Sequence, residues 1–325
     1  MQWQWIRRKG WLTALALAWL TAIAGCAATP HGVRITDPNR MFPKDTIIHT
    51  ETGESVDFQA MMADLFETRI TYIGESHTDP IHHRAQLDII KSLYEQDPRL
   101  AIGMEMFDRT YQPILDQWSR GELDENQFLE KSHWYANWKY DYALYRDLLE
   151  FARENHIRLI GLNIPFHIPA KIATGGIDNL SAEDRRHLPD AINTSNADHR
   201  AFVKQIHAFH SMRGRENFEY FYEAQCAWDE AMAEAVVETI GPDRLVVLAG
   251  RGHIQGGFGI PGRAFSRNAL PYRTILLAPI GTATDRSAAD YIWTTPAGRP
   301  GTDSDHRMPF FRTFPKGSPP NSTTY

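Results

Sequence analysis

Cysteine is almost absent from this 325-residue chain, which contains only Cys26 and Cys226. Cys26 lies at the end of an N-terminal apolar run, and Cys226 lies in a segment with helical periodicity, so we expect no internal disulfide. Stability must then come from a packed core. A chain of this length with 42% hydrophobic residues can bury one.

An excess of positive charge is also absent, since 34 Lys and Arg face 40 Asp and Glu and the formal net charge is -6. Nucleic-acid binding relies on clustered basic side chains that neutralise phosphates, so the composition argues against such a partner. Internal repeats are missing as well, which excludes a solenoid. Only the segment 295–325 is rich in Pro, Gly and Ser, and we expect this tail to be disordered.

The N-terminus carries basic residues at positions 7–9, then an apolar run that ends in IAGC at Cys26. This order is typical of a secretory signal, and the IAGC ending resembles a bacterial lipobox. We therefore expect a signal peptide over 1–25, lipidation of Cys26 and a tether over 26–45. These features predict an outer-membrane lipoprotein that faces the periplasm of a Gram-negative bacterium. The alternative is a plain signal peptide or an uncleaved membrane anchor.

Short apolar runs alternate with amphipathic stretches over residues 46–294, which we expect to form the folded domain. The runs ITYIG, LAIGM, RLIGLNI, RLVVLAG and RTILLAPI are rich in strand-favouring residues. Their alternation with helical patterns predicts an α/β fold with a mostly parallel central sheet flanked by helices. The interval of about 164–243 contains no convincing strand and predicts a helical insertion or cap.

Ionisable side chains follow several of these runs. ITYIG leads into Glu75 and His77, LAIGM leads into Glu105, and RLVVLAG is followed by Arg-Gly-His with His253. Because parallel strands present their carboxyl ends at one edge of a sheet, we expect these four side chains to share a pocket. Two carboxylates so close favour a bound cation or a protonated imidazole. The alternative is a set of local roles, such as an ion pair of Glu105 with Arg109.

A second group lies in the stretch NFEYFYEAQCAWDEAMAEAV. Tyr222, Gln225 and Asp229 recur there at i, i+3 and i+7, which places them on one helix face. A core stripe beside a solvated stripe is the alternative interpretation. Upstream, His207 and His210 are spaced so that they could share a ligand or a metal, or they could be two surface histidines.

The segments YIGESHTDPIHHRAQLDII, AIGMEMFDRTYQPILDQW, FYEAQCAWDEAMAEAV and VVLAGRGHI together resemble the ChaN-like haem-binding lipoproteins of bacteria. That family belongs to a wider group with the Tiki metalloproteases, the TraB-like proteins and the erythromycin esterases. The similarity covers about residues 46–280. It implies an α/β fold, attachment to a membrane and a role in binding haem and assisting iron uptake.

The resemblance also assigns the GESH residues Glu75 and His77, with Glu105 and His253, to a pocket shared by the wider group. In contrast to this pocket, no single motif of the family identifies the axial ligand of the haem. Tyrosine suits ferric haem, and the chain lacks the CxxCH sequence of covalently attached haem. Our candidates for haem contact, with Tyr222 the first choice as ligand, are Tyr222, Tyr220, His207, His210, Gln225 and Asp229.

Haem binding on the periplasmic side of a membrane is thus the first functional hypothesis, with a homodimer as a possible assembly. The aromatic residues between 134 and 166 would suit an apolar ligand. The alternative is a hydrolase that uses the strand-end pocket. A divalent metal held by His77, His253, Glu75 and Glu105 would activate water, or His77 would act as general base without metal. A serine triad is disfavoured because GxSxG is missing. Finally, His82 and His83 are expected on the surface.

Overall fold

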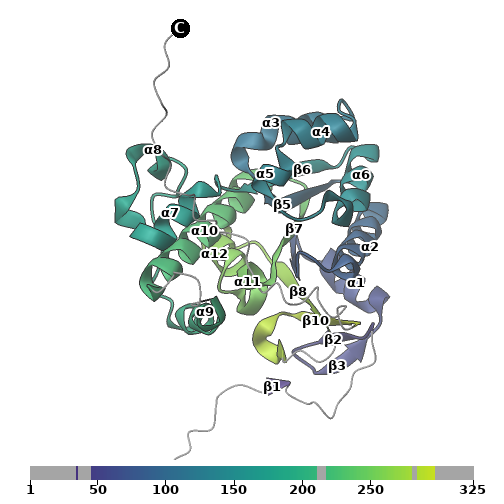
Figure 1. The fold of residues 1–325 in the computed structure, drawn as a ribbon. Helices are drawn as coiled ribbons and strands as arrows, with labels where there is room; N and C mark the ends of the chain where they lie inside the picture. The colour runs from purple at the N-terminus through teal and green to yellow at the C-terminus, as the bar shows by residue number, and fades with distance from the viewer. Residues whose placement is uncertain (1–33, 36–44, 211–216, 280–283, 297–325) are drawn as a thin grey trace, which may run out of the picture. The chain divides into compact units, whose positions relative to one another are not determined.

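The computed structural model describes residues 34–35, 45–210, 217–279 and 284–296. The predicted signal peptide, tether and tail fall almost entirely outside these residues. The central feature is an eight-stranded sheet in the order β3-β2-β10-β8-β4-β7-β5-β6 (Figure 1). The bounds of its strands are β2 (Ile47–His49), β3 (Glu54–Val56), β4 (Ile70–Glu75), β5 (Leu100–Asp108), β6 (Arg158–Asn163), β7 (Arg244–Gly250), β8 (Tyr272–Pro279) and β10 (Tyr291–Thr295).

Six strands, from β10 through β8, β4, β7 and β5 to β6, are parallel to one another. Only β2 and β3 join antiparallel at one edge, while β1 (Arg34–Ile35) and β9 (Thr284–Asp285) form a separate antiparallel pair. The predicted fold class, an α/β protein with a mostly parallel sheet, is therefore confirmed.

Helices cover both faces of this sheet, with α1 and α2 on one side and α7, α9, α10 and α12 on the other (Figure 1). In the described part of 164–243, the chain forms helices and loops between β6 and β7. The helices are α1 (Phe58–Phe66), α2 (Pro80–Gln96), α3 (Gln112–Ser119), α4 (Glu125–Lys131), α5 (Trp134–Asn137), α6 (Arg146–Glu154), α7 (His167–Gly175), α8 (Ala182–Arg185), α9 (Ala197–His210), α10 (Phe218–Thr239), α11 (Arg251–Ile254) and α12 (Ile260–Asn268).

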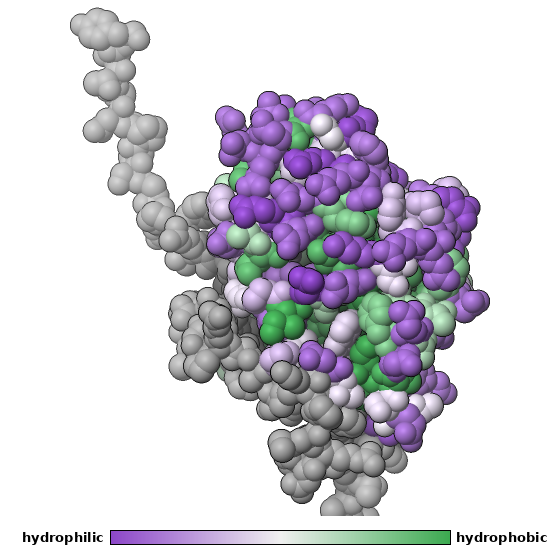
Figure 2. Space-filling model, turned by 90° about the vertical axis from the view of Figure 1, so that its right-hand side faces the viewer, coloured by the Kyte–Doolittle hydropathy of each residue, from purple (hydrophilic) through white to green (hydrophobic). Residues whose placement is uncertain are grey.

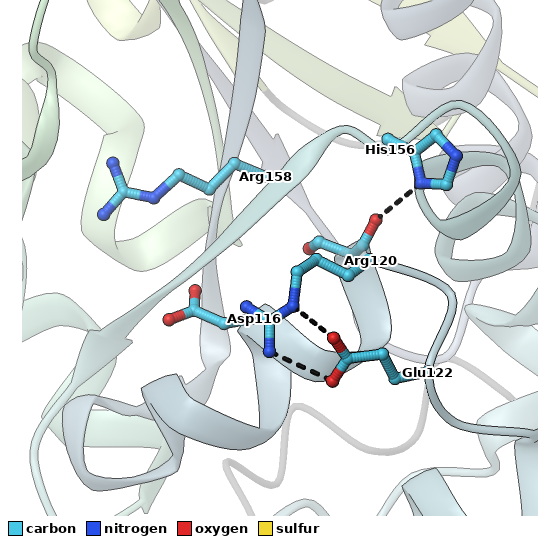
Figure 3. Close-up of a pocket in the computed structure, with 6 residues that line it drawn as sticks. Asp116, Arg120, Glu122, His156 and Arg158 are labelled. Carbon is cyan, nitrogen blue, oxygen red and sulfur yellow. Dashed lines mark hydrogen bonds and ion pairs between the residues drawn. The ribbon is translucent and has the colours of Figure 1, made fainter.

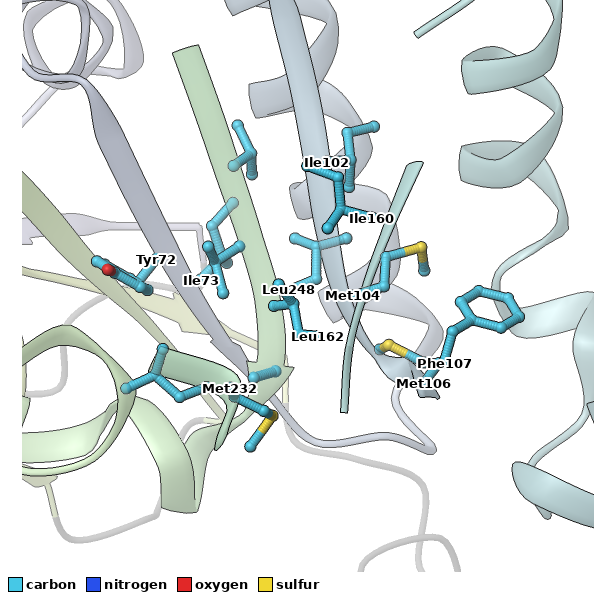
Figure 4. Close-up of a cluster of buried hydrophobic side chains, with 14 of the residues drawn as sticks. Tyr72, Ile73, Ile102, Met104, Met106, Phe107, Ile160, Leu162, Met232 and Leu248 are labelled. Carbon is cyan, nitrogen blue, oxygen red and sulfur yellow. The ribbon is translucent and has the colours of Figure 1, made fainter. Parts of the chain in front are cut away.

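The core lies on both faces of the central strands. Every residue of β4 and β5 is buried, because helices cover both faces, and this explains why these strands read as continuous apolar runs. Figure 4 shows Ile73, Ile102, Ile160 and Leu248 from four neighbouring strands together with Met232 of α10. Each such buried side chain contributes roughly 1.5–3 kcal/mol relative to exposure. The sheet therefore holds its carboxyl edge rigidly.

The surface differs from this interior. Figure 2 shows one face, which is mainly hydrophilic with scattered apolar side chains. Across the described residues, the large apolar side chains that stay exposed are Ile81, Tyr135 and Phe265. None of the helices in the described part of the chain has the length and apolar character needed to cross a membrane.

Candidate functional site

The four strand-end residues meet around Gly250, the last residue of β7. Glu105 accepts a hydrogen bond from the Gly250 N–H at 2.6 Å. A Cβ at Gly250 would lie 2.9 Å from the Nε2 and Cε1 atoms of His77 and 3.5 Å from Glu105 Oε2, so the close approach of these side chains requires glycine. Glu75 binds His77, and His253 lies beside Glu105. The expected convergence is therefore present, and we call Glu75, His77, Glu105, Asp229 and His253 the strand-end cluster.

Pairing of parallel strands brings these residues together. Both β4 and β5 pair with β7, and Glu75 lies opposite Gly250 in the register. Glu105 lies inside β5, because this strand continues to Asp108 through an irregularity in its pairing with β6. Asn163, at the end of β6, donates to the Glu105 carbonyl at 2.9 Å and so supports this irregular segment.

Glu75 is fully enclosed by hydrogen-bond donors. Its carboxylate accepts from the Tyr145 hydroxyl at 2.6 Å, from Gln86 Nε2 at 2.5 Å and from His77 Nδ1 at 2.8 Å, and His83 Nδ1 lies 3.4 Å away. Burial alone would raise the pKa of Glu75, but His83 and His77 outweigh it and hold this pKa well below its usual value. Glu75 is therefore a fixed negative charge that orients His77.

His82 and His83 are buried, which corrects the prediction that they lie on the surface. The sequence predicted the helix start at Asp79 and Pro80, but the first turn of α2 faces the sheet edge. His83 Nε2 donates to the His77 carbonyl at 3.2 Å. Burial would lower the pKa of His83, but Glu75 outweighs burial and raises this pKa. His82 Nδ1 accepts a hydrogen bond from the Ser76 N–H at 2.9 Å, and burial lowers the pKa of His82 to about 4. Both rings hold the GESH loop in place.

His253 lies between two carboxylates. Its Nδ1 donates to Asp229 at 2.6 Å, and its Nε2 lies 3.5 Å from Glu105 Oε1. Burial would lower the pKa of His253, but Glu105 and Asp229 outweigh burial and raise it to about 8. Burial would likewise raise the pKa of Asp229, which His253 and His199 hold below its usual value. The His199 Nε2 atom is 3.4 Å from Asp229.

The divalent metal predicted at Glu75, His77, Glu105 and His253 finds no support in this geometry. These side chains are paired with one another, and the described stretches contain no group of three or more His, Cys, Asp or Glu that could hold a metal ion. The alternative pair of Glu105 with Arg109 is not formed either, because Arg109 binds Glu234 at 3.1 Å.

Residues of α10 divide between two places. Gln225 and Asp229 face the strand-end cluster, and the Gln225 amide lies 3.0 Å from His253 Nδ1. Tyr222, one turn earlier, packs instead in a small cluster with Phe221 and residues of α9. The three side chains therefore lie along one helix face but contact different neighbours, since Tyr222 belongs to the cluster with α9.

The candidate haem ligands lie in or near this second cluster. Tyr222 is buried and donates to the Asn196 carbonyl at 3.1 Å, and burial raises its pKa. His207 packs its ring against Phe221 at a centroid distance of 5.1 Å. Tyr220 is half-buried, and its ring lies close to Gly176. The side chain of His210 lies outside the described residues.

Aromatic rings connect the strand-end cluster to its surroundings. The ring centroids of His77 and Trp138 are 4.7 Å apart, those of His77 and Tyr140 are 5.1 Å apart, and Trp228 lies 5.4 Å from His253. Part of the aromatic segment 134–166 thus packs at the cluster. No local sequence signal pointed to the side chains that hold the acids in place, because they come from remote segments of the chain. These side chains are Tyr145, Gln86 and His83 beside Glu75, and His199 beside Asp229.

A surface hollow of about 590 Å³ lies elsewhere (Figure 3). It forms where β6 begins, which is the opposite end of the strand from the cluster, and Arg120 is paired there with Glu122 at 2.6 Å. This hollow therefore lies away from the strand-end cluster. The lining residues are Asp116, Ser119, Arg120, Glu122, His156 and Arg158.

Similar proteins were found by sequence and by structure. The family model for haem-binding uptake proteins of the ChaN type, Tiki superfamily, matches residues 61–263. A solved structure of cofacial haem binding to ChaN of Campylobacter jejuni superposes with a TM-score of 0.64 at 19% identity, covering 76% of this chain and 95% of that one. An erythromycin esterase in its open conformation gives a TM-score of 0.44 at 14% identity, with 73% and 77% covered.

A curated relative, the chloroplastic Reticulata-related 5 protein of Arabidopsis thaliana, is 26% identical over 278 residues. The match covers 75% of this chain and 36% of the plant protein, so the chain spans about a third of that relative's length. The family model covers most of the folded domain, including every member of the strand-end cluster. On this evidence, the chain belongs to the ChaN family of haem-binding uptake proteins in the Tiki superfamily.

Proposed function

We propose that this protein binds ferric haem non-covalently and assists haem-iron uptake as a lipoprotein on the periplasmic side of the outer membrane. Family membership supports the ligand. The signal-like N-terminus that ends in IAGC at Cys26 supports the attachment. Two or more acyl chains would anchor the protein stably.

The cluster between α9 and α10 is the part of the described structure that suits haem best. It lies beside the main core and combines Phe202, Phe218, Phe221 and Tyr222 with Ile192, Val203, Ile206 and Cys226. Haem needs an apolar contact surface of this kind. The strand-end cluster suits it less, since buried carboxylates would face the apolar macrocycle.

Cationic side chains beside these rings are the observation that carries the assignment. The Arg200 guanidinium lies 5.0 Å from the ring centre of Phe218 and 5.1 Å from that of Tyr222, and Lys204 Nζ lies 5.9 Å from Phe218. Arg200 is paired with Glu219, so a propionate would share or replace that ion pair. Haem carries two propionates next to its apolar macrocycle, so an apolar surface edged by Arg and Lys complements both parts.

Tyr222 is the axial ligand that this cluster favours, because its ring is part of the cluster and lies beside Arg200. Iron binding would replace its bond to Asn196 and would have to lower a pKa that burial raises. His207, whose ring packs against Phe221, is the second candidate. Tyr220 is the third, because its ring lies against Gly176 at the end of α7, outside this cluster.

The test is a titration of ferric haem into the protein lacking residues 1–26, followed by absorption spectroscopy. Tyr222→Phe should remove the charge-transfer absorption of a phenolate ligand, while Tyr220→Phe, the same substitution two residues away, should keep it. The reverse result would move the ligand to Tyr220, and two unchanged spectra would move it to His207. Absence of haem binding at micromolar concentrations would refute the proposal itself.

Lipidation is tested separately in the full-length chain. Cys26→Ser should change the mass of the mature protein and release it from the membrane fraction, while Cys226→Ser, the same change at the buried cysteine, should not. Equal membrane fractionation of the Cys26 variant and the wild type would contradict the anchor. The possible homodimer is tested by light scattering, where it predicts twice the mass of one chain.

A further inference from the structure

Two buried polar atoms of the strand-end cluster face each other as a charged pair without a hydrogen bond. Glu105 Oε1 and His253 Nε2 are 3.5 Å apart, and neither forms a hydrogen bond within the described part of the chain. Both side chains are almost fully buried. Leaving such groups unsatisfied costs roughly 1–3 kcal/mol each, so a site that keeps them open points to a ligand with polar atoms of its own.

His77 provides the third feature. Its Nδ1 donates to Glu75 at 2.8 Å, which leaves Nε2 as the free acceptor of the neutral ring. Nε2 lies against Gly250, where an added Cβ would be 2.9 Å from it and 3.5 Å from Glu105 Oε2. The side chain is 12% exposed, so this ring connects the cluster to solvent. An imidazole oriented by a buried carboxylate with its other nitrogen free is the arrangement of a general base.

We propose that the strand-end cluster is a metal-independent hydrolytic centre, in which His77 is the general base and His253 the general acid for a small neutral carboxylic ester. The site is distinct from the proposed haem surface. Glu75 acts as a positioning residue for His77, and Asp229 acts in the same way for His253.

The reaction follows from these positions. His77 Nε2 takes a proton from water as the water oxygen bonds to the acyl carbon. The bond between the acyl carbon and the alcohol oxygen then breaks, and His253 gives the Nε2 proton to that oxygen. The products are a carboxylic acid and an alcohol, and solvent returns the two rings to their starting states. Each proton transfer of this kind contributes typically 10²–10⁴-fold in rate.

Charge and shape define the substrate class. Glu75, Glu105 and Asp229 bring three carboxylates to the cluster, and their negative potential disfavours phosphate esters or other anions. Trp138 and Tyr140 pack their rings against His77 and would contact an apolar acyl or alcohol group. Because His77 is only slightly exposed, a small ester should enter more readily than a large one.

The experiment measures hydrolysis of p-nitrophenyl acetate by the protein lacking residues 1–26, before and after loading with haem. His77→Gln should lower the rate at least about 100-fold. His187→Gln is the matched control, because this half-buried histidine lies outside the cluster, and it should keep the wild-type rate. Glu75→Gln should lower the rate as well and abolish the rate decrease in deuterium oxide that a general base produces.

Haem titration and circular dichroism of each variant separate loss of chemistry from loss of fold. A variant that binds haem normally but has lost hydrolysis supports the proposal. Equal rates for the wild type and His77→Gln would overturn it, whether or not haem binds. Hydrolysis of p-nitrophenyl phosphate in preference to the acetate would overturn the assignment of a neutral ester.

Discussion

Asp229→Asn tests how the buried charges of the strand-end cluster are balanced. The substitution keeps the size of the side chain and removes the negative charge that pairs with His253 at 2.6 Å. Breaking one partner of a buried ion pair costs roughly 3–5 kcal/mol. We expect a loss of about 3 kcal/mol in the free energy of unfolding at pH 6, where His253 is protonated.

The loss should shrink at high pH. The pKa of His253 is raised from 6.5 to about 8, so its contribution to stability is complete below pH 6.5 and disappears as the pH rises through 8. At about 1.4 kcal/mol per pH unit, this contribution cannot exceed about 2 kcal/mol. Glu105 supplies part of it, so Asp229→Asn should cost about 1 kcal/mol less at pH 9.5 than at pH 6.

Urea unfolding at the two pH values measures both losses. Asp64→Asn is the matched control, because Asp64 pairs with Arg273 at 2.7 Å and arginine stays protonated throughout this range. That variant should lose the same stability at pH 6 and at pH 9.5. An Asp229→Asn loss that is equal at both values would refute the assignment of a protonated His253 as the partner of Asp229.

Two further predictions concern the neighbours of the cluster. Tyr145→Phe removes the hydroxyl that donates to Glu75 at 2.6 Å and should lower the free energy of unfolding by roughly 1.5–3 kcal/mol, measured by urea denaturation. Tyr142→Phe should cost nearly nothing, since that buried hydroxyl has no hydrogen-bond partner in the described residues, and equal losses would contradict the role of Tyr145. Gly250→Ala should force the His77 ring aside and cost roughly 1–3 kcal/mol in thermal unfolding, because the added Cβ would lie 2.9 Å from that ring. An unchanged His77 signal in NMR spectra of this variant would show that the space around Gly250 is larger than the contacts indicate.

Much of the fold and part of the site could be predicted from the sequence. Continuous apolar runs fixed the central strands, since helices cover both faces of the sheet, and Asp79 with Pro80 marked the start of α2. The parallel order of the strands then made a meeting of Glu75, Glu105 and His253 foreseeable, because parallel strands end at one edge.

The tertiary structure decided which atoms pair and which stay free. Three contacts come from distant segments: His83 from the first turn of α2, Tyr145 from the residue before α6, and Asp229 from α10. Because these residues are far apart along the chain, no local sequence pattern predicts their contact. The same packing buried His82 and turned Tyr222 away from the cluster to bind Asn196. Local sequence patterns determine strands, helix starts and the edge where polar groups gather, because those depend on neighbours along the chain. The direction of each side chain depends on remote backbone, and only the packed fold supplies it.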